Sequence, residues 1–210
     1  QFFDQQLGYP ITLISANDFI QGAMNQFNVL LLADGSYDFF NKKEANEELK
    51  NWVRRGGKII ALENAVAQMA KADWGIKSKQ EEDSMDEIKK PNYGNLKKYE
   101  NRERDELTTS MPGSIFKLEL DNSHPLGFGY PDYYYTLKQD NHIYEFFREG
   151  GWNVGVIKKD NYISGFTGSG LKEKLKDGLL IGAQDFGKGQ VIYLAEDPIF
   201  RSFWENGKLL

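Results

Sequence analysis

An alternation of strand and helix signals over residues 29–74 constrains the fold more than any other feature of the sequence. Residues 29–33 form an uninterrupted apolar run, which is typical of a strand buried on both faces. Residues 42–55 carry apolar side chains at helical spacing, and two glycines end that helix. A strand over 58–62 and a helix over 65–74 follow. Strands that alternate with helices predict a mostly parallel sheet covered by helices on both faces.

The sequence then changes character twice. Residues 77–106 hold eight basic and nine acidic side chains, so this stretch lacks the apolar residues for a core of its own. We predict a solvated, partly helical and mobile insertion there, and a role as a lid or docking arm stays open. Beyond it the pattern is rich in strands, and a hairpin turn at 186–189 joins the last two. These later strands are predicted over 114–121, 153–157, 162–166, 179–184 and 190–194.

Length and composition narrow the possibilities further. The 210 residues predict a single domain over 1–210, in which the first strand is missing and residues 200–210 read as the start of an amphipathic helix. We therefore expect the chain to be a fragment of a longer polypeptide. The net charge of −5 argues against a nucleic-acid partner, and no apolar run is long enough for a membrane span.

The sequence predicts no metal site and no cysteine chemistry. It contains no Cys, which excludes disulfides, thiolate ligands and a thiol nucleophile. Its two histidines, His124 and His142, lack the partners of a helical metal site, although Glu145 lies three residues after His142. Because Pro125 fixes an extended turn after His124, we expect that imidazole to bond to the backbone.

An aromatic cluster is the best surface candidate. Residues 127–135 include Tyr130, Tyr133, Tyr134 and Tyr135, which could stack on a sugar or grip a peptide. The simpler interpretation, which we favour, is that these rings cover an open end of the sheet.

Residues 29–70 resemble the core of class I glutamine amidotransferase-like domains. In that family a strand leads to a Gly-containing turn, and a helix ending in Gly-Gly leads to a second strand and a Gly-x-Cys-x-Gly elbow. Gln68 sets the alignment, which places the family's catalytic Cys position at Asn64. The family's catalytic His follows a late strand, but residues 195–198 contain none. Because an amide cannot replace a thiolate as the acyl acceptor, we expect no glutaminase activity and no catalytic residues in this segment.

A narrower resemblance covers most of the chain. Residues 112–116, 120–130 and 189–210 look like the C-terminal amidotransferase-like domain of bacterial (Bacteroidetes-type) zinc carboxypeptidases of peptidase family M14. The resemblance implies a secreted or periplasmic parent enzyme whose zinc lies on a separate peptidase domain. That peptidase domain would be a partner within the same polypeptide, and this segment would hold no cofactor. The letters His-x-x-Glu at His142 and Glu145 lack the surroundings of a peptidase site.

These observations predict a three-layer, flavodoxin-like α/β sandwich with a mostly parallel sheet, a strand-rich C-terminal part and a charged insertion. The predicted function is that of a non-catalytic accessory domain, which packs on the peptidase or binds a peptide or glycan. Open α/β sheets bind ligands at the carboxyl ends of their strands. The crevice there would involve Gly35, Glu63, Asn64 and Glu196.

Two alternatives remain open at this point. The chain could be an independent hydrolase that uses the carboxylates of Glu63, Glu196 and Asp197, provided that these side chains meet in space. It could instead be a carbohydrate-binding module built on the tyrosines of 130–135, which requires exposed rings in one plane.

Overall fold

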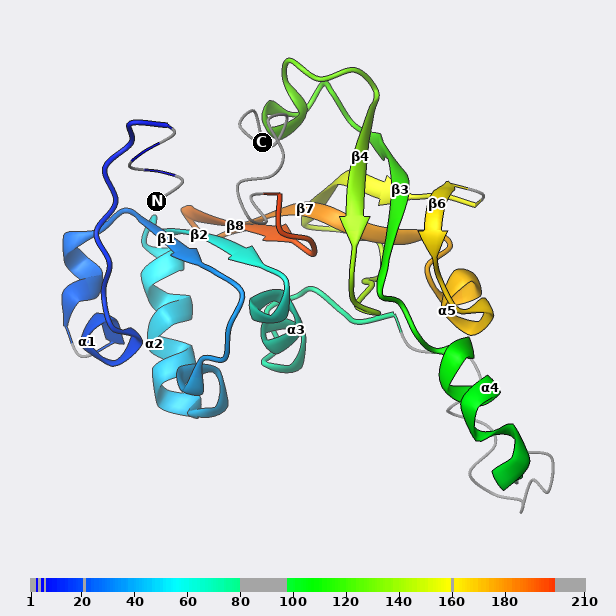
Figure 1. Cartoon of the computed structure of the whole chain (residues 1–210). Coiled ribbons are helices and arrows are strands. Elements are labelled where there is room, and N and C mark those ends of the chain that lie inside the picture. The colour runs from blue at the N-terminus through cyan, green and yellow to red at the C-terminus, as the bar shows by residue number, and fades with distance from the viewer. Residues whose placement is uncertain are drawn as a thin grey trace.

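The computed structural model describes Phe3, Gln5 and residues 7–20, 22–79, 98–159 and 161–198. Within these residues eight strands form one curled sheet, and seven of them lie in the order β1-β2-β8-β7-β5-β3-β4 (Figure 1). The eighth, β6, pairs with residues 113–116 of β3, on the edge of β3 opposite β4. The strands are β1 (Val29–Leu32), β2 (Lys58–Leu62), β3 (Gly113–Leu120), β4 (Tyr133–Lys138), β5 (Gly151–Ile157), β6 (Tyr162–Phe166), β7 (Gly178–Phe186) and β8 (Gly189–Leu194).

The sheet is mixed and mostly antiparallel, which corrects the prediction of a mostly parallel sheet. Only β1 with β2 and β2 with β8 pair in parallel among the described strands. The five other pairings are antiparallel, including the hairpin between β7 and β8. The strand–helix alternation extends only through 29–71, and the later strands add to the far side of β8 by antiparallel connections.

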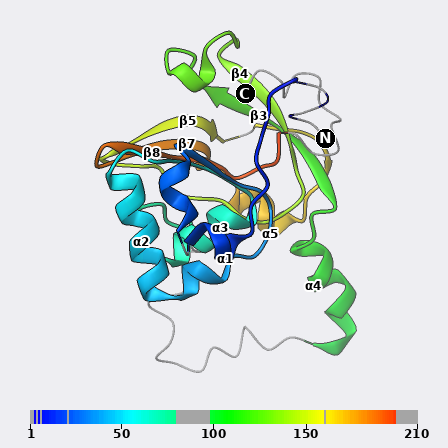
Figure 2. The ribbon, with the colours of Figure 1, turned by 90° about the vertical axis from the view of Figure 1, so that its left-hand side faces the viewer.

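The helices gather on one side of the sheet. Figures 1 and 2 both place α1 (Ala16–Ile20), α2 (Lys43–Arg54), α3 (Asn64–Lys71) and α5 (Ser169–Lys174) on that side, whereas α4 (Arg102–Thr108) extends away from it. Short 3-10 helices lie at Ala23–Gln26, Asp38–Asn41, Tyr99–Asn101 and Pro125–Gly127. Over the described ranges no helix covers the opposite face, so the expected third layer is not formed by these residues.

Helix α2 shows why the amidotransferase-like half folds as predicted. Its Leu49, Trp52 and Val53 are buried against the sheet and carry the helical apolar stripe. The helix ends where the N–H of Gly57 donates to the carbonyl of Trp52 at 3.2 Å. A Cβ on Gly57 would lie 2.5 Å from the Trp52 ring, so only glycine fits this close approach.

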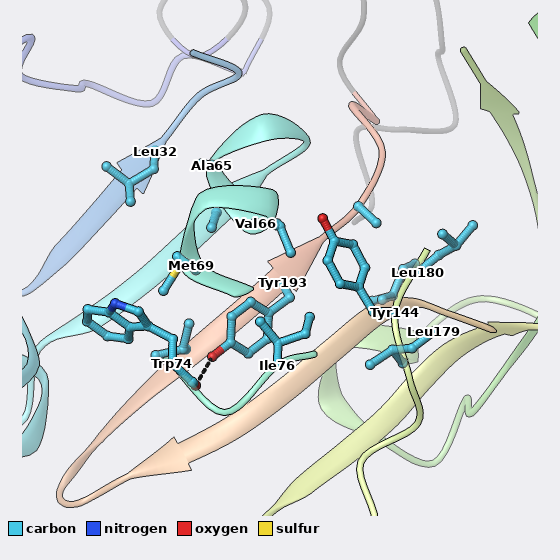
Figure 3. Packing of buried hydrophobic residues seen from close by; sticks show 14 of the residues in the cluster. Leu32, Ala65, Val66, Met69, Trp74, Ile76, Tyr144, Leu179, Leu180 and Tyr193 are labelled. Atoms are coloured by element: carbon cyan, nitrogen blue, oxygen red, sulfur yellow. Dashed lines mark hydrogen bonds between the residues drawn. The ribbon is translucent and has the colours of Figure 1, made fainter. Parts of the chain in front are cut away.

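Two buried aromatic side chains organise the core between the helices and the sheet (Figure 3). The Tyr193 hydroxyl lies 2.8 Å from the carbonyl oxygen of Trp74 and 2.9 Å from Oε1 of Gln184. The Trp74 indole N–H donates to Oδ1 of Asn46 at 2.8 Å. These bonds satisfy the polar atoms of both rings, and they tie β8 to the segment that follows α3.

Several predicted elements are confirmed and others lie outside the description. The strand at 58–62 and the helix within 42–55 form as predicted, while β4 was not predicted at all. The charged insertion is helical over Arg102–Thr108, but residues 80–97 lie outside the described residues, as do 199–210. No helix among the residues described has the length and apolar character to cross a bilayer.

Substitutions at two neighbouring residues of β2 should show that helices cover only one face of the sheet. Ile59 is fully buried toward the helices, while Ile60 is partly exposed on the opposite face, beside Leu31 and Ile192. We expect Ile59→Ala to lower the free energy of unfolding by about 2–5 kcal/mol in urea titrations, because it leaves a cavity. Ile60→Ala should cost clearly less; equal costs would show that the second face is covered in solution.

Candidate ligand-binding crevice

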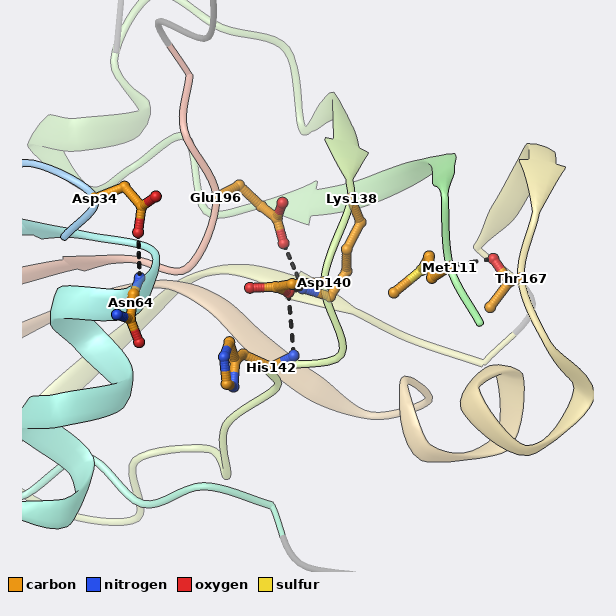
Figure 4. Close-up of polar contacts among 8 residues, drawn as sticks. All are labelled: Asp34, Asn64, Met111, Lys138, Asp140, His142, Thr167 and Glu196. Carbon is orange, nitrogen blue, oxygen red and sulfur yellow. Dashed lines mark hydrogen bonds and ion pairs between the residues drawn. The ribbon is translucent and has the colours of Figure 1, made fainter. Parts of the chain in front are cut away.

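The loops after three strands meet at one edge of the sheet. Parallel β1, β2 and β8 end there, followed by Asp34, Glu63 and Glu196 respectively. Strand β4 also ends nearby and delivers Lys138 and Asp140 (Figure 4). The predicted convergence of Gly35, Glu63, Asn64 and Glu196 at this edge therefore matches the observed topology.

Glu63 lies at a strained turn between β2 and α3. Its backbone angles are φ 44° and ψ −112°, and its N–H donates to the carbonyl of Leu194 at 2.8 Å. A non-glycine residue at positive φ costs on the order of 1–3 kcal/mol, and such residues gather at functional sites. The strand–strained residue–helix arrangement is that of a nucleophile elbow. The strained residue is Glu63, not Asn64, so the elbow is one residue earlier than the alignment predicts.

Asn64 and Gln68 tie the start of α3 to the loop after β1. The Asn64 side-chain amide donates to the carbonyl of Gly35 at 3.0 Å, and its backbone N–H donates to Oδ1 of Asp34 at 3.3 Å. The Gln68 amide donates to the same Gly35 carbonyl at 2.7 Å and accepts from the N–H of Tyr37 at 2.8 Å. Asn64 therefore has a positioning role here, which suits an amide.

A buried cation forms the other wall. The Lys138 side chain is fully buried, and its Nζ donates to Oδ1 of Asp140 and to Oε1 of Glu196, each at 2.5 Å (Figure 4). The sequence analysis missed Lys138 and Asp140 because β4 was not predicted. The signal that could have found β4 is its run of three tyrosines and a threonine, residue types that favour strands; the inward position of Lys138 becomes visible only in the folded strand.

Burial and the charges of neighbouring carboxylates raise the pKa values of two carboxyl groups at this edge. Burial raises the pKa of Glu63 to about 7, with further increases from the charges of Asp34, Asp197 and Asp140. Burial also raises the pKa of Glu196 to about 8, and the charge of Asp140 adds to this while Lys138 opposes it. The charge of Glu63 also raises the pKa of Glu196, so the structure brings these two predicted residues within electrostatic reach of each other.

Tyr144 adds a buried polar group beside these carboxyls. Its hydroxyl is buried without a hydrogen-bond partner, and burial, followed by the charges of Asp140 and Glu196, raises its pKa (Figure 3). Next to Glu196 lies a cavity of about 20 Å³, walled mainly by apolar side chains that include Tyr134. This volume holds about one water molecule. This edge of the sheet is thus rich in hydrogen-bonding groups, and the cavity beside Glu196 is small.

The two histidines differ in how they bond: His124 uses its imidazole, and His142 reaches Asp140 through its backbone N–H. The Nδ1 of His124 accepts from the N–H of Leu126 at 3.2 Å, which confirms the expected bond to the backbone. The backbone N–H of His142 donates to Oδ1 of Asp140 at 3.1 Å. Across the described residues no group of three His, Cys, Asp or Glu side chains is arranged to hold a metal ion.

The four tyrosines of the aromatic cluster do not share one surface. On β4, Tyr133 and Tyr135 are exposed on one face, and their rings meet edge to face with centroids 5.5 Å apart. Tyr134 is buried on the other face, where it packs edge to face on Tyr130. The rings therefore do not form the single plane that a sugar-binding platform requires.

Comparison with solved structures shows similarity of fold. A ThuA-like protein from Bacteroides uniformis ATCC 8492 matches with a TM-score of 0.52 and 11% identity, over 92% of this chain and 69% of that chain. Cytoplasmic protein STM3548 from Salmonella typhimurium matches with a TM-score of 0.43 and 14% identity, over 90% and 65% of the two chains. Gan42B, a GH42 β-galactosidase, matches with a TM-score of 0.41 and 13% identity, over 92% of this chain and 21% of that chain.

The first of these likenesses supports a glutamine amidotransferase-like fold, as the sequence resemblance implied. At this level of identity it shows the fold alone. No protein-family model and no curated protein matches the sequence. None of the three structures is named as a carboxypeptidase, so that part of the resemblance stays a prediction.

Glu63→Gln should change the pH dependence of stability. A carboxyl whose pKa rises from 4.5 to about 7 on folding stabilises the fold fully below 4.5, and this contribution is lost as pH rises toward 7. The Gln side chain of the variant does not titrate, so its contribution to stability does not change with pH. We therefore expect the variant to match the wild type at about pH 4 and to show a higher Tm at about pH 8 in thermal scans. The exposed control Glu48→Gln should show no such trend; an unchanged profile for Glu63→Gln would contradict the prediction.

Lys138→Met should expose the dependence of the crevice on its buried cation. Removing one partner of a buried ion pair typically costs about 3–5 kcal/mol, because the other charge is left uncompensated. We expect that loss in urea titrations at about pH 8 and a smaller loss at about pH 5, where the carboxyls bind protons. Lys158→Met breaks an exposed pair with Glu119 and should cost at most about 1 kcal/mol. Similar losses for both variants would rule out the buried network as a stabilising element.

Proposed function

We propose that the chain is a non-catalytic accessory domain of a secreted or periplasmic zinc metallocarboxypeptidase. The observation that carries the non-catalytic part is the elbow, whose strained residue is Glu63 in a chain without any Cys. A carboxyl there has no thiolate chemistry to offer, and the next residue, Asn64, is engaged in holding the β1 loop. The link to a carboxypeptidase is supported by the sequence resemblance of residues 112–116, 120–130 and 189–210.

The crevice supports a binding role for this domain. Glu63 and Glu196 with raised pKa values, together with Asp34 and Asp140, form a site richer in carboxyl groups than in cations. Such a site favours ligands that present N–H donors, as the backbone and amino terminus of a peptide do. The proposed partners are the peptidase domain of the same polypeptide and its peptide substrate, with a glycan as an alternative. Zinc belongs to the peptidase domain in this proposal.

An independent hydrolase is the second candidate, because Glu63 acts electrostatically on Glu196, which is buried, and Glu63 is itself half-buried. Acid–base pairs work best when the two pKa values are pushed apart, so that one group is ionised and the other protonated. Here both pKa values are raised, to about 7 and about 8. Hydrolysis of ester or glycoside test substrates that disappears in Glu63→Gln would favour this candidate.

The accessory role is tested in the full polypeptide. We expect the reading frame upstream of Gln1 to encode a His-x-x-Glu motif and a distal His. In that protein, Glu63→Gln with Asn64→Ala should raise KM for peptide substrates while kcat stays unchanged, because the variants alter binding away from the zinc. The exposed pair Glu48→Gln with Asn51→Ala is the matched control. A start codon with its own signal peptide close to Gln1 would contradict the proposal.

A further inference from the structure

A second cavity lies away from the crevice, between strands β5 and β6 and helix α5. Its volume is about 290 Å³, close to the lower end of the range for small-molecule sites. It shares no lining residue with the small cavity beside Glu196. Figure 1 shows β6 directly beside α5 at this end of the molecule. The cavity is therefore a separate feature that the proposed function leaves unexplained.

Its polar lining is cationic. Lys158 follows β5, Lys172 lies in α5 and Lys176 follows that helix, and all three line the cavity. The Nζ of Lys172 lies 3.9 Å from the centroid of the Tyr162 ring, which holds the ammonium group at the cavity wall. The lining includes no acidic side chain among the residues described. Lys158 is paired with Glu119, which lies outside the lining, so Lys172 is the cation on which an anionic ligand would bind.

An unsatisfied amide lies in the same wall. Asn161 lines the cavity, and its side-chain nitrogen is buried without a hydrogen-bond partner. A buried donor in this state costs free energy, and it loses no bond when it turns toward a new acceptor. Carboxylate oxygens accept such hydrogen bonds strongly.

The remaining walls are apolar. Phe116, Ile157 and Leu175 line the cavity, and the Phe116 and Tyr162 rings meet edge to face with centroids 5.7 Å apart. These three side chains are already buried, whereas the Tyr162 ring in the same lining is partly exposed. A ligand that carries an apolar body would cover this ring and gain the free energy of burying apolar surface.

We propose that this cavity binds a small organic carboxylate with an apolar or aromatic body, such as the C-terminal residue of a peptide. The carboxylate lies at Lys172 and Asn161, and the apolar body lies against the partly exposed ring of Tyr162. This proposal does not rest on the carboxypeptidase link. A single ionic contact with partly exposed lysines gives affinities in the millimolar range, as is usual for weak sites of this size.

The probe is N-acetyl-L-phenylalanine, which has a carboxylate and a ring and no ammonium group. Calorimetric or NMR titration of the whole chain should give saturable binding that weakens as salt increases. N-acetyl-L-phenylalaninamide, which lacks the charge, should bind at least about tenfold more weakly. Glucuronate, which lacks an apolar body, should also bind more weakly; equal affinity would overturn the role of the apolar walls.

Two lysine variants make the test specific. Lys172→Met keeps the length of the side chain and removes the charge, and it should weaken binding at least about fivefold. Lys117→Met is the matched control, because its Nζ lies 4.7 Å from the ring centroid of Tyr133, outside the cavity. Its affinity should equal that of the wild type. No saturable binding, equal binding of the amide, or equal losses in the two variants would overturn the proposal, with thermal scans confirming that each variant folds.

Discussion

The position of β8 between β2 and β7 determines most of this structure. On one side β8 pairs in parallel with β2, and on the other it pairs antiparallel with β7. Its Val191 and Tyr193 are buried toward the helices, so the same strand also contributes to the core. A Cβ on Gly189 would lie 2.1 Å from the carbonyl oxygens of Val53 and Gly57, which seats the start of β8 against the end of α2. The amidotransferase-like half and the strand-rich half are thus joined through this single strand.

The crevice depends on the same arrangement. Because β8 runs parallel to β2, the residues that follow both strands reach one edge, and Glu196 lies near the strained Glu63. The antiparallel strand β4 then brings Lys138 to that edge, where the buried ammonium group bonds to two carboxyls. The backbone strain at Glu63 and the raised pKa values of the carboxyls are both unfavourable for folding. Their presence together is typical of a site maintained for binding or chemistry rather than for stability.

Local patterns allowed the first half of the fold to be predicted, and long-range pairing explains why the rest was not. The apolar runs at 29–33 and 58–62 become β1 and β2 because a strand buried on both faces needs such runs. Which strand lies beside β2 depends on residues far along the chain. No local pattern therefore indicated that most strand pairings are antiparallel. The aromatic-rich stretch that forms β4 was interpreted as a surface cluster, and Lys138 was missed with it. The strain at Glu63 is likewise a property of the folded backbone.

The pairing of Lys58 with Gln190 has a consequence for the order of folding. More than half of the chain separates these two residues, and contacts over such distances form slowly because a long loop must close first. Until residues 189–194 have left the ribosome, β1 and β2 make up a two-stranded sheet whose inner edge is unpaired. Such an edge is prone to pair with other chains. Pairing of this edge therefore comes well after the synthesis of β1 and β2, and the newly made chain depends on β8 for protection against aggregation.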